Sequence, residues 1–408
     1  MTIILLNSLI PNPGIFNTRR ISGNPDRKIK CYFCSMSTDL QISSLDSWLD
    51  TGGKPLVIAG PCSAESEFQV METARRISEI PQVTVFRAGL WKPRTRPGEF
   101  SGVGEKGLPW LTHVKEETGL KTTVEVADAS HVEQALKHGV DILWLGARTV
   151  ANPFSVQAIA DALRGVDIPV MVKNPISPDL KLWLGAIERI HAMGIRKMIA
   201  IHRGFHYFEK SIYRNAPMWE IPIELKRLVP ELPIIVDPSH ICGRRDLLES
   251  IAQKALDLEM DGLIIESHFD PDRALTDAAQ QITPKDLQEM IHRLVIREKR
   301  GNIDFENKLE ELRTEIDKLD GELLQILAKR MEIIDEIGEY KNKNDITILQ
   351  MKRWAGIIED RLAIGTHMGL EETFLKNLLS LMHEESIRRQ TVIFNGKVGG
   401  SLKLKVKS

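Results

Sequence analysis

The sequence predicts an α/β fold: a (β/α)8 barrel of the TIM-barrel type, followed by a smaller all-α domain. From residue 55 onward, eight short, apolar, β-branched runs alternate with stretches of helical periodicity. No glycine-rich dinucleotide fingerprint follows the first run. The alternation ends near residue 300, where apolar residues start to recur in heptads. Alternating strands and helices form a parallel sheet, and eight strands favour closure into a barrel.

The eight predicted strands cover residues 55–59, 83–88, 121–126, 141–145, 168–173, 197–202, 232–237 and 262–266. Helices are predicted between them, among others over residues 67–79, 129–138, 155–163, 180–193, 244–257 and 284–296. Connections between parallel strands are right-handed. The carboxyl ends of all eight strands are therefore expected at one face of the barrel, where the active sites of this architecture form.

The segment after residue 300 has a different pattern, because strand-like runs stop and charged residues become more frequent. A heptad spacing is kept by Leu309, Leu312, Ile316, Leu319, Leu323 and Ile326, and then by Ile333, Ile337 and Tyr340. This spacing predicts one long helix with an apolar seam. Two further helices are expected over residues 349–362 and 371–390.

Domain boundaries follow from these changes in pattern. Residues 1–36 are expected to be a disordered extension, or one translated from a start upstream of Met36. The barrel domain is predicted over residues 37–299, a linker over 300–307, the helical domain over 308–394 and a flexible tail over 395–408. Cys31 and Cys34 form a single CxxC, which without a second Cys or His pair is half a zinc site.

The composition favours a cytoplasmic protein that acts on small molecules. Lys and Arg number 54 against 56 Asp and Glu, so the formal net charge is −2 and no basic field attracts nucleic acid or an anionic membrane. Four cysteines in 408 residues do not make a disulfide framework. No apolar run approaches the roughly 20 residues that span a bilayer. We expect neither nucleic-acid nor membrane partners.

Four potential metal ligands follow strands that barrel closure makes neighbours. Cys62 comes just after the first strand and His240 just after the seventh, while Glu266 ends the eighth and Asp277 lies in the loop beyond it. Sulfur, nitrogen and oxygen ligands together suit Mn, Fe or Co, with Zn also possible, better than Mg or Ca. The alternative is that Cys62 is a small buried apolar residue and that the other three are ordinary loop residues.

The strand ends on the opposite side carry cations. The second strand leads to Arg87 and Lys92, the fourth to Arg148, the fifth to Lys173 and the sixth to Arg203. Each of these could be solvated or held in an ordinary salt bridge. Gathered at one mouth, they predict a multiply anionic ligand, because guanidinium forks match phosphate and carboxylate geometry. The residues alone thus predict phosphorylated substrates beside a Lewis-acid metal.

The motifs at these strand ends resemble one family. GPCS, WKPRT, LGAR, the lysine of MVKNP, IHRG, IVDPSH, IIESH and the aspartate of ALTD occur in the order and spacing of the metal-dependent 3-deoxy-D-arabino-heptulosonate 7-phosphate (DAHP) synthases. The resemblance spans roughly residues 40 to 298 and is to the short form of the family. It implies the first step of the shikimate pathway, condensation of phosphoenolpyruvate with D-erythrose 4-phosphate, with a divalent metal and no organic cofactor.

Carried over position by position, the resemblance implies three groups of site residues. The metal ligands would be Cys62, His240, Glu266 and Asp277, and Lys92 would be catalytic. Arg94 and Thr95 would hold the aldose phosphate. Phosphoenolpyruvate would be surrounded by Arg87, Lys92, Glu125, Ala147, Arg148, Lys173 and Arg203.

Two related families on the same fold are alternatives. The 3-deoxy-octulosonate 8-phosphate synthases and the sialic acid synthases resemble this barrel but have a different, Asn-containing loop where KPRT stands at residues 92–95. The KPRT sequence therefore favours the four-carbon aldose. His202 departs from the family, since related sequences often have an acidic residue before the Arg-Gly pair. Cys242 is either a core thiol or an oxidation partner for Cys62.

One charged residue interrupts the apolar seam of the long helix. Arg330 stands between Ile326 and Ile333, and a charge that faces a core requires a partner. Lys341 lies three helical turns further on and returns to nearly the same face, whereas Arg313 points about 100° away. A pocket that uses all three cations must take Arg313 from another protomer. The alternative is that Arg330 extends its charged end into solvent.

Residues 306–392 resemble the all-helical chorismate mutases in the segments LEELRTEIDKLD, LAKRMEI, YKNK, QMKRW and EESIRRQ. The Claisen rearrangement needs no proton transfer, so preorganised cations and amides suffice. Trp354 and Gln350 depart from acidic residues that are common in the family. The resemblance implies that chorismate and prephenate bind to Arg313 of a partner protomer, Arg330, Lys341, Arg353, Ser386 and Gln390, with Arg330, Lys341 and Gln390 catalytic.

Two interpretations of the helical domain remain open. It is a working mutase, or it is a module that binds chorismate or prephenate and restrains the barrel. Both are compatible in one chain, because a product bound by the helical domain can inhibit the barrel through a coupling free energy. We expect both roles, and a homodimer formed through the helical domain.

Overall fold

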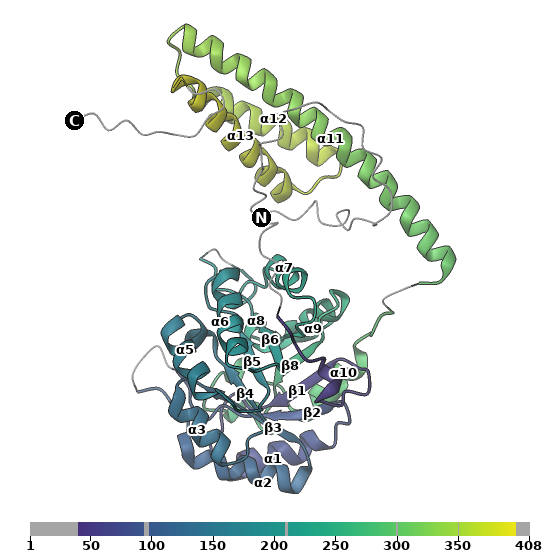
Figure 1. Ribbon diagram of the computed structural model, residues 1–408. Coiled ribbons are helices and arrows are strands. Elements are labelled where there is room, and N and C mark those ends of the chain that lie inside the picture. Colours follow the sequence, from purple (N-terminus) through teal and green to yellow (C-terminus); the bar gives the residue numbers. More distant parts are fainter. Residues whose placement is uncertain (1–39, 94–97, 209–210, 299–300, 350, 397–408) are drawn as a thin grey trace, which may run out of the picture. The chain divides into compact units, whose positions relative to one another are not determined.

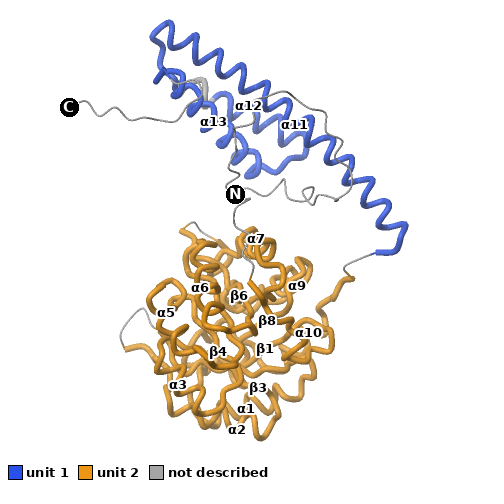
Figure 2. The backbone as a smooth tube through the Cα atoms, viewed as in Figure 1, with its two compact units in different colours: residues 1–17, 300–408 blue, residues 18–299 orange. Residues whose placement is uncertain are grey.

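The computed structural model describes residues 40–93, 98–208, 211–298, 301–349 and 351–396, and for residues 351–355 the backbone alone. These residues form two compact units, which meet in the sequence at residues 299 and 300 (Figure 2). Several residues singled out in the sequence lie outside the described ones: Cys31, Cys34, Arg94, Thr95 and Gln350, and the side chains of Arg353 and Trp354.

The first unit is a closed barrel of eight parallel strands in sequence order, β1 to β8, with helices around it (Figure 1). The predicted fold class is therefore confirmed. Each strand ends within one or two residues of its predicted position. The strands are β1 (Leu56–Gly60), β2 (Val83–Arg87), β3 (Lys121–Val126), β4 (Ile142–Leu145), β5 (Val170–Lys173), β6 (Met198–His202), β7 (Ile234–Val236) and β8 (Gly262–Glu266).

Helices connect successive strands, and polar side chains cap several of their starts. Ser66 accepts a hydrogen bond from the Gln69 backbone, and Thr283 forms a capping box with Asp286. The α-helices are α1 (Glu67–Ser78), α2 (Leu108–Thr118), α3 (Ala129–Lys137), α4 (Ala147–Val150), α5 (Pro153–Ala162), α6 (Leu180–Ala192), α7 (Glu220–Leu228), α8 (Pro238–Cys242), α9 (Leu248–Asp257) and α10 (Pro284–Arg293). Short 3-10 helices are η1 (Leu45–Ser47), η2 (Gly104–Gly107), η3 (Arg245–Leu247), η4 (Pro271–Arg273) and η5 (Ala278–Gln280).

Apolar side chains fill the inside of the barrel, so its axis is a packed core and not a pore. Ile58, Trp144, Ile201 and other inward-facing strand residues form one buried cluster, which Leu49 from the segment before β1 joins. A second and larger cluster lies between the strands and the surrounding helices. These two cores hold the strands rigidly, so that the residues at their carboxyl ends have fixed positions.

The second unit consists of three helices, α11 (Ile303–Lys343), α12 (Met351–His367) and α13 (Glu372–Phe394). The predicted all-α domain is confirmed. The first helix begins inside the predicted linker of residues 300–307, because Asn302 caps it by accepting a hydrogen bond from the Phe305 backbone. Towards its end, α11 packs on α13, where Asp335 and Arg389 form a two-bond ion pair of 2.8 and 2.6 Å.

The earlier part of α11 keeps its apolar seam exposed within one chain. The side chains there are between 45% and 65% exposed, and they are Leu312, Ile316, Leu319, Leu323 and Ile326. Residues of this kind at heptad spacing are usually covered by another helix.

Among the described helices of either unit, none has the length and apolar character needed to cross a bilayer.

Candidate active site

A cavity of about 550 Å³ opens at the carboxyl ends of the barrel strands. Its walls come mainly from the loops after six of the eight strands, and most of the side chains that line it are charged or polar. The lining residues are Lys92, Pro93, Glu99, Glu125, Gly146, Ala147, Arg148, Lys173, Ile176, Arg203, His206, Arg214, Asn215, His240 and Asp277. Most of the described residues that the sequence singled out for the barrel mouth thus lie on one cavity.

Four side chains that could bind a metal meet at one side of this cavity, and we call them the donor set: Cys62, His240, Glu266 and Asp277. Ligand atoms of Cys62, Glu266 and Asp277 all lie within 4.8 Å of one another. The Cys62 Sγ is 3.2 Å from Asp277 Oδ2. His240 stands beside this group, with its Nε2 3.7 Å from Glu266 Oε1. Residues from three parts of the sequence are therefore brought together.

The register of the barrel explains why they meet. Gly60 at the end of β1 pairs with Glu266 at the end of β8, so Cys62 follows two residues after this pair. On the other side of β8, β7 ends at Val236, and Asp237 caps the short helix α8 by accepting a hydrogen bond from the His240 backbone at 3.1 Å. This single turn of helix places the His240 imidazole next to Glu266.

Burial and neighbouring charges set the protonation of the donor set. Burial raises the pKa of the Cys62 thiol to about 12, and the Glu266 carboxylate adds to this shift. Burial alone would raise the pKa of Glu266 and of Asp277, but nearby cationic side chains, with Arg214 the main one for Asp277, hold both below their ordinary values. Burial lowers the pKa of His240. At neutral pH the set thus offers two carboxylates and a neutral imidazole.

These donors fit a divalent transition metal. Glu266 is fully buried, and its Oε1 has no hydrogen-bond partner among the described residues. The Arg87 Nη2 lies 3.3 Å from this oxygen, so the fit to a metal rests on the chemistry of the four donors taken together. One thiol, one imidazole and two carboxylates form a mixed S/N/O shell, which suits Mn, Fe, Co or Zn.

Cations lie directly against the donor set. The Lys92 Nζ is 2.9 Å from Cys62 Sγ, and the Arg87 Nη2 is 3.3 Å from Glu266 Oε1. Arg87 is 1% exposed, and its guanidinium also lies over the Trp144 ring, 5.1 Å from the centroid. Its Nε and Nη1 have no partner among the described residues, so two donors remain for an anion.

A chain of charges continues to the next strands. Lys173 at the end of β5 forms a buried ion pair of 2.9 Å with Asp237, whose Oδ2 is also 2.8 Å from the His240 Nδ1. Asp237 therefore lies against one ring nitrogen of His240, while the other ring nitrogen faces Glu266. Arg203 donates to Asn215 at 2.9 Å. Burial lowers the pKa of Arg203 to about 10, so it stays charged at neutral pH.

Glu125 at the end of β3 is held against the backbone of the neighbouring strand end. The Trp144 Nε1 donates to its Oε2 at 3.1 Å. A Cβ on Gly146 would lie 2.0 Å from its Oε1, so only glycine leaves space for the carboxylate at this position. The Glu125 carboxylate thus occupies the space that a side chain at residue 146, directly after β4, would need.

Several residues of this site were missed in the sequence. Asp237, Arg214, Asn215 and Gln280 either line the cavity or hold its ligands. Asp237 is the first residue of the DPSH motif and could have been named from its position. The other three lie within long loops after β6 and β8, where distance from a strand end gives no signal of which side chains turn inward.

In the helical unit, three of the predicted residues come together. The Arg330 Nη1 donates to the Ser386 Oγ at 3.0 Å, and the Gln390 Nε2 donates to the Ser386 carbonyl at 3.2 Å. Lys341 donates to the Ile348 carbonyl at 2.6 Å. Arg313 does not join them, because its exposed side chain lies 3.8 Å from Glu310 on the same helix.

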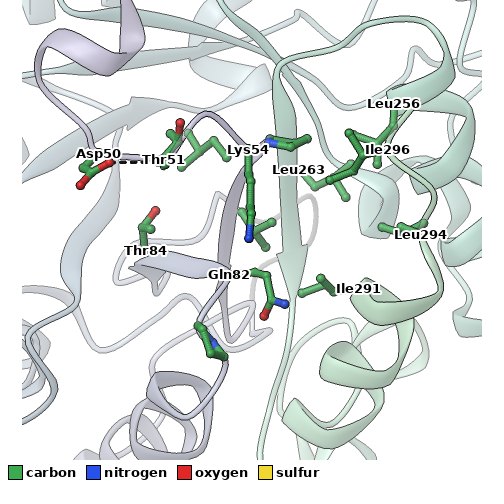
Figure 3. Close-up of a pocket in the computed structure, with 15 residues that line it drawn as sticks. Asp50, Thr51, Lys54, Gln82, Thr84, Leu256, Leu263, Ile291, Leu294 and Ile296 are labelled. Atoms are coloured by element: carbon green, nitrogen blue, oxygen red, sulfur yellow. Dashed lines mark hydrogen bonds between the residues drawn. The ribbon is translucent and has the colours of Figure 1, made fainter. Parts of the chain in front are cut away.

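A second cavity of about 380 Å³ lies near the amino ends of β1, β2 and β8 (Figure 3). Apolar side chains including Leu263, Ile291 and Leu294 face Lys54 and Gln82 across it (Figure 3). None of the residues predicted for catalysis lines this cavity. The residues predicted for catalysis in the barrel that the structure describes lie instead at its carboxyl-end mouth.

Comparison with known proteins gives a family for each of the two units. The family model of the DAHP synthetase I family matches residues 40–299, and that of chorismate mutase type II matches residues 312–391. A phospho-2-dehydro-3-deoxyheptonate aldolase of Thermotoga maritima is 34% identical, and the match covers 58% of this chain and 68% of the length of that protein. A 2-dehydro-3-deoxyphosphooctonate aldolase of Desulfotalea psychrophila is 27% identical over 62% of this chain and 94% of its own.

Two solved structures have the same barrel. The DAHP synthase of Thermotoga maritima matches with a TM-score of 0.54 at 31% identity, covering 64% of this chain and 71% of that one. A truncated form of the enzyme from the same organism matches with a TM-score of 0.51 at 29% identity, covering 64% of this chain and 88% of the other.

Proposed function

The chain belongs to the DAHP synthetase I family and carries a chorismate mutase type II domain behind its barrel, and on this basis we propose how its own residues perform the two reactions. In the barrel, phosphoenolpyruvate and D-erythrose 4-phosphate condense to DAHP. In the helical unit, chorismate rearranges to prephenate. The observation that carries the first proposal is the donor set facing a group of cations across a single cavity.

Anion binding is the task of the cations around the cavity. Arg148, Lys173 and Arg203 line it and would hold the phosphate and carboxylate of phosphoenolpyruvate, together with the two unpartnered donors of Arg87. These groups also stabilise the negative charge that stays on the phosphate as it leaves. Their fixed places at strand ends mean that little reorganisation is needed during the reaction.

The aldehyde of the aldose phosphate is expected next to the donor set. Cys62, His240, Glu266 and Asp277 would hold a divalent cation, which when bound supplies Lewis acidity toward the aldehyde oxygen. Burial disfavours the charge of Lys92, yet the neighbouring Cys62 and Glu266 raise its pKa, so it is an ammonium group. Lys92 would therefore donate a proton or hydrogen bond to the oxygen that becomes a hydroxyl when C3 of phosphoenolpyruvate adds to the aldehyde carbon.

The remaining steps balance the reaction. Water adds at C2 of the former phosphoenolpyruvate, and the bond from C2 to the phosphate oxygen breaks, which leaves the C2 carbonyl and inorganic phosphate. Glu125 faces the same cavity, fixed by Trp144, and is placed to accept the proton of that water. Glu125 thus completes the group of residues that act on phosphoenolpyruvate.

A comparison of two aldose phosphates tests this assignment. The similarity to 2-dehydro-3-deoxyphosphooctonate aldolases makes D-arabinose 5-phosphate the competing acceptor. We expect the full-length protein to form DAHP from D-erythrose 4-phosphate with a kcat/KM at least tenfold above that for D-arabinose 5-phosphate. The reverse preference would assign the barrel to the octulosonate reaction, while turnover of neither would refute the synthase proposal.

In the helical unit, Arg330, Ser386 and Gln390 form the centre of the mutase site. The Gln390 Oε1 is buried without a partner among the described residues, and Arg330 reaches its neighbour Ser386 from the facing helix. A dicarboxylate would find a guanidinium and an amide already in place, which is what a rearrangement without proton transfer requires. Arg330→Ala in the full-length chain should lower prephenate formation by about 10²-fold or more; an unchanged rate would place the reaction elsewhere.

A homodimer would complete this site. Arg313 lies away from Arg330 in its own chain, and the seam around it is exposed. A second copy that covers the seam could bring its Arg313 to the site. Mixed dimers of Arg313→Ala and Arg330→Ala chains should then regain part of the mutase activity that each variant lacks. No recovery in mixed dimers would contradict the sharing of Arg313.

A further inference from the structure

Two residues outside the donor set connect its two carboxylates. The Gln280 Nε2 donates to Glu266 Oε2 at 2.6 Å, and the Gln280 Oε1 accepts from the Arg214 Nη1 at 2.7 Å. The same Nη1 donates to Asp277 Oδ1 at 3.0 Å. The turn η5 makes this possible, since the Gln280 backbone bonds back to the Asp277 carbonyl at 3.1 Å. Gln280 is 1% exposed, so solvent does not replace these bonds.

The chemistry of the groups fixes the direction of this chain of bonds. A guanidinium only donates, so it must meet the oxygen end of the Gln280 amide. The amide nitrogen then necessarily points at Glu266, which as a carboxylate only accepts. Arg214 therefore settles the orientation of Gln280, and Gln280 settles which oxygen of Glu266 is engaged.

One oxygen of each carboxylate remains for a cation. Glu266 Oε2 is engaged by Gln280, while Oε1 faces His240 Nε2 at 3.7 Å and Arg87 Nη2 at 3.3 Å. Asp277 Oδ1 is engaged by Arg214, while Oδ2 accepts a hydrogen bond, among the described residues, only from Cys62, a fellow member of the donor set, at 3.2 Å. The two remaining oxygens are the ones on the side of the other donors. We call the hydrogen bonds from Arg214 to Gln280 and from Gln280 to Glu266 the relay. Without it, either carboxylate could rotate and offer its other oxygen, or both oxygens, to a cation.

We propose that Gln280 and Arg214 are positioning residues that select one oxygen of each carboxylate for the cation, and that they thereby set the affinity and coordination geometry of the metal. The proposal rests on the proposed function, because it requires that the donor set binds a divalent cation. Loss of such outer partners typically weakens metal binding by about 10–100-fold.

Metal affinity of the full-length protein tests the proposal. Mn²⁺ binding is measured by competition with a chromophoric chelator for the wild type, Gln280→Met and Arg214→Gln. Gln280→Met keeps the length of the side chain but removes both amide ends, and we expect a dissociation constant about 10–100-fold higher. Arg214→Gln changes a half-exposed loop residue and is expected to weaken binding in the same direction. The matched control is Gln157→Met. It removes an exposed hydrogen bond that the Gln157 side-chain amide donates to Asp161 on α5, and it should bind Mn²⁺ like the wild type.

A second readout separates positioning from general loss of structure. The visible absorption of the Co²⁺-loaded protein reports the geometry around the ion, and it should change in both relay variants while the thermal unfolding of the metal-free proteins stays within a few degrees of wild type. If both variants bind Mn²⁺ within twofold of wild type and keep its Co²⁺ spectrum, the relay has no such role. If the wild type itself binds neither ion, it is the proposed function that fails.

Discussion

Charged side chains at the mouth of the barrel owe their state to immediate neighbours. Glu266 is fully buried, and an isolated carboxylate there would be neutral. Arg87 at 3.3 Å and the Gln280 amide at 2.6 Å stabilise its ionised form. Because removing one partner of a buried ion pair leaves the other uncompensated, substitutions here affect both stability and ligand binding.

Replacement of Glu266 by its amide tests the role of this charge. Glu266→Gln keeps the shape but removes one anionic donor, so we expect DAHP formation at saturating Mn²⁺ to fall roughly 10²-fold or more. Steady-state kinetics measure the effect. Glu249→Gln, which breaks an exposed ion pair with Arg293, is the control and should leave the rate unchanged. A Glu266→Gln rate above a tenth of wild type would contradict the assignment.

The buried His202 leads to a prediction for how the free energy of unfolding depends on pH. Burial lowers the pKa of His202 to about 3, whereas an unfolded histidine titrates near 6.5. Below pH 6.5 the unfolded chain takes up a proton that the folded protein excludes, so stability present above that pH is lost as pH falls towards 3. The loss is about 1.4 kcal/mol per pH unit.

A substitution removes this dependence. His202→Phe fits a site already formed by Trp183, Phe205 and Trp219, and it has no proton to bind. Between pH 7 and pH 5 the wild type should lose about 2 kcal/mol more unfolding free energy than the variant, measured with urea. Identical pH dependence of the two proteins would show that His202 is not held neutral.

At this scale the sequence indicated which side chains come together better than it indicated the residues that orient them. Cys62 and Glu266 stand at strand ends, and closure of the barrel alone brings such positions together. Arg214 and Gln280 lie in loops whose path depends on packing against neighbours, and no local pattern distinguishes them from solvated residues. The orienting bonds of a site are thus harder to read than its reactive groups.

The strands were predicted to within two residues at either end, whether or not all their residues are buried. All five residues of β1 and of β8 are buried, and their apolar runs marked them clearly. The helices α2 and α7 were not named. Pro222 interrupts the apolar pattern of α7, and α2 follows a glycine-rich stretch, so their helical periodicity is weak. The start of α11 at Ile303 was missed because the cap at Asn302 was assigned to a linker.

The seam of α11 gives a prediction for assembly. Ile316 is half exposed in the single chain, and in a dimer it would be buried. Ile316→Asp would place a charge in that interface, so we expect the dimer to dissociate at least 100-fold more readily in sedimentation, with loss of mutase activity. Lys318→Glu, outside the seam on the same helix, should leave the dimer intact. An Ile316→Asp protein that stays dimeric would exclude this face as the interface.

For the molecule as a whole, the question is whether ligand binding in the helical unit changes the rate of DAHP synthesis in the barrel. The fold class and both families could be predicted from motifs and periodicity, because each domain has its own complete pattern. Regulation of the barrel by a ligand of the helical domain was also expected from the sequence, and it stays a prediction, since it depends on how ligand binding in one unit changes the other. We infer that prephenate or chorismate bound in the helical unit inhibits DAHP synthesis.

Prephenate should therefore lower the rate of DAHP formation by the full-length protein, by about 5–150-fold for a coupling of 1–3 kcal/mol. Arg330→Ala removes a group that binds the effector but lies outside the barrel, so it should abolish inhibition and leave the uninhibited rate unchanged. Rates are measured with and without prephenate. Inhibition that persists in the variant would mean that prephenate acts at the barrel itself.

Metal dependence tests the central claim most directly. The full-length protein is stripped with a chelator, freed of it and assayed for DAHP formation before and after addition of Mn²⁺, with metal content measured on the same samples. Activity should disappear with the metal and return as one ion binds per barrel, and Cys62→Ser should recover little of it. Undiminished synthesis by metal-free protein would contradict the claim that Cys62, His240, Glu266 and Asp277 serve as a metal centre.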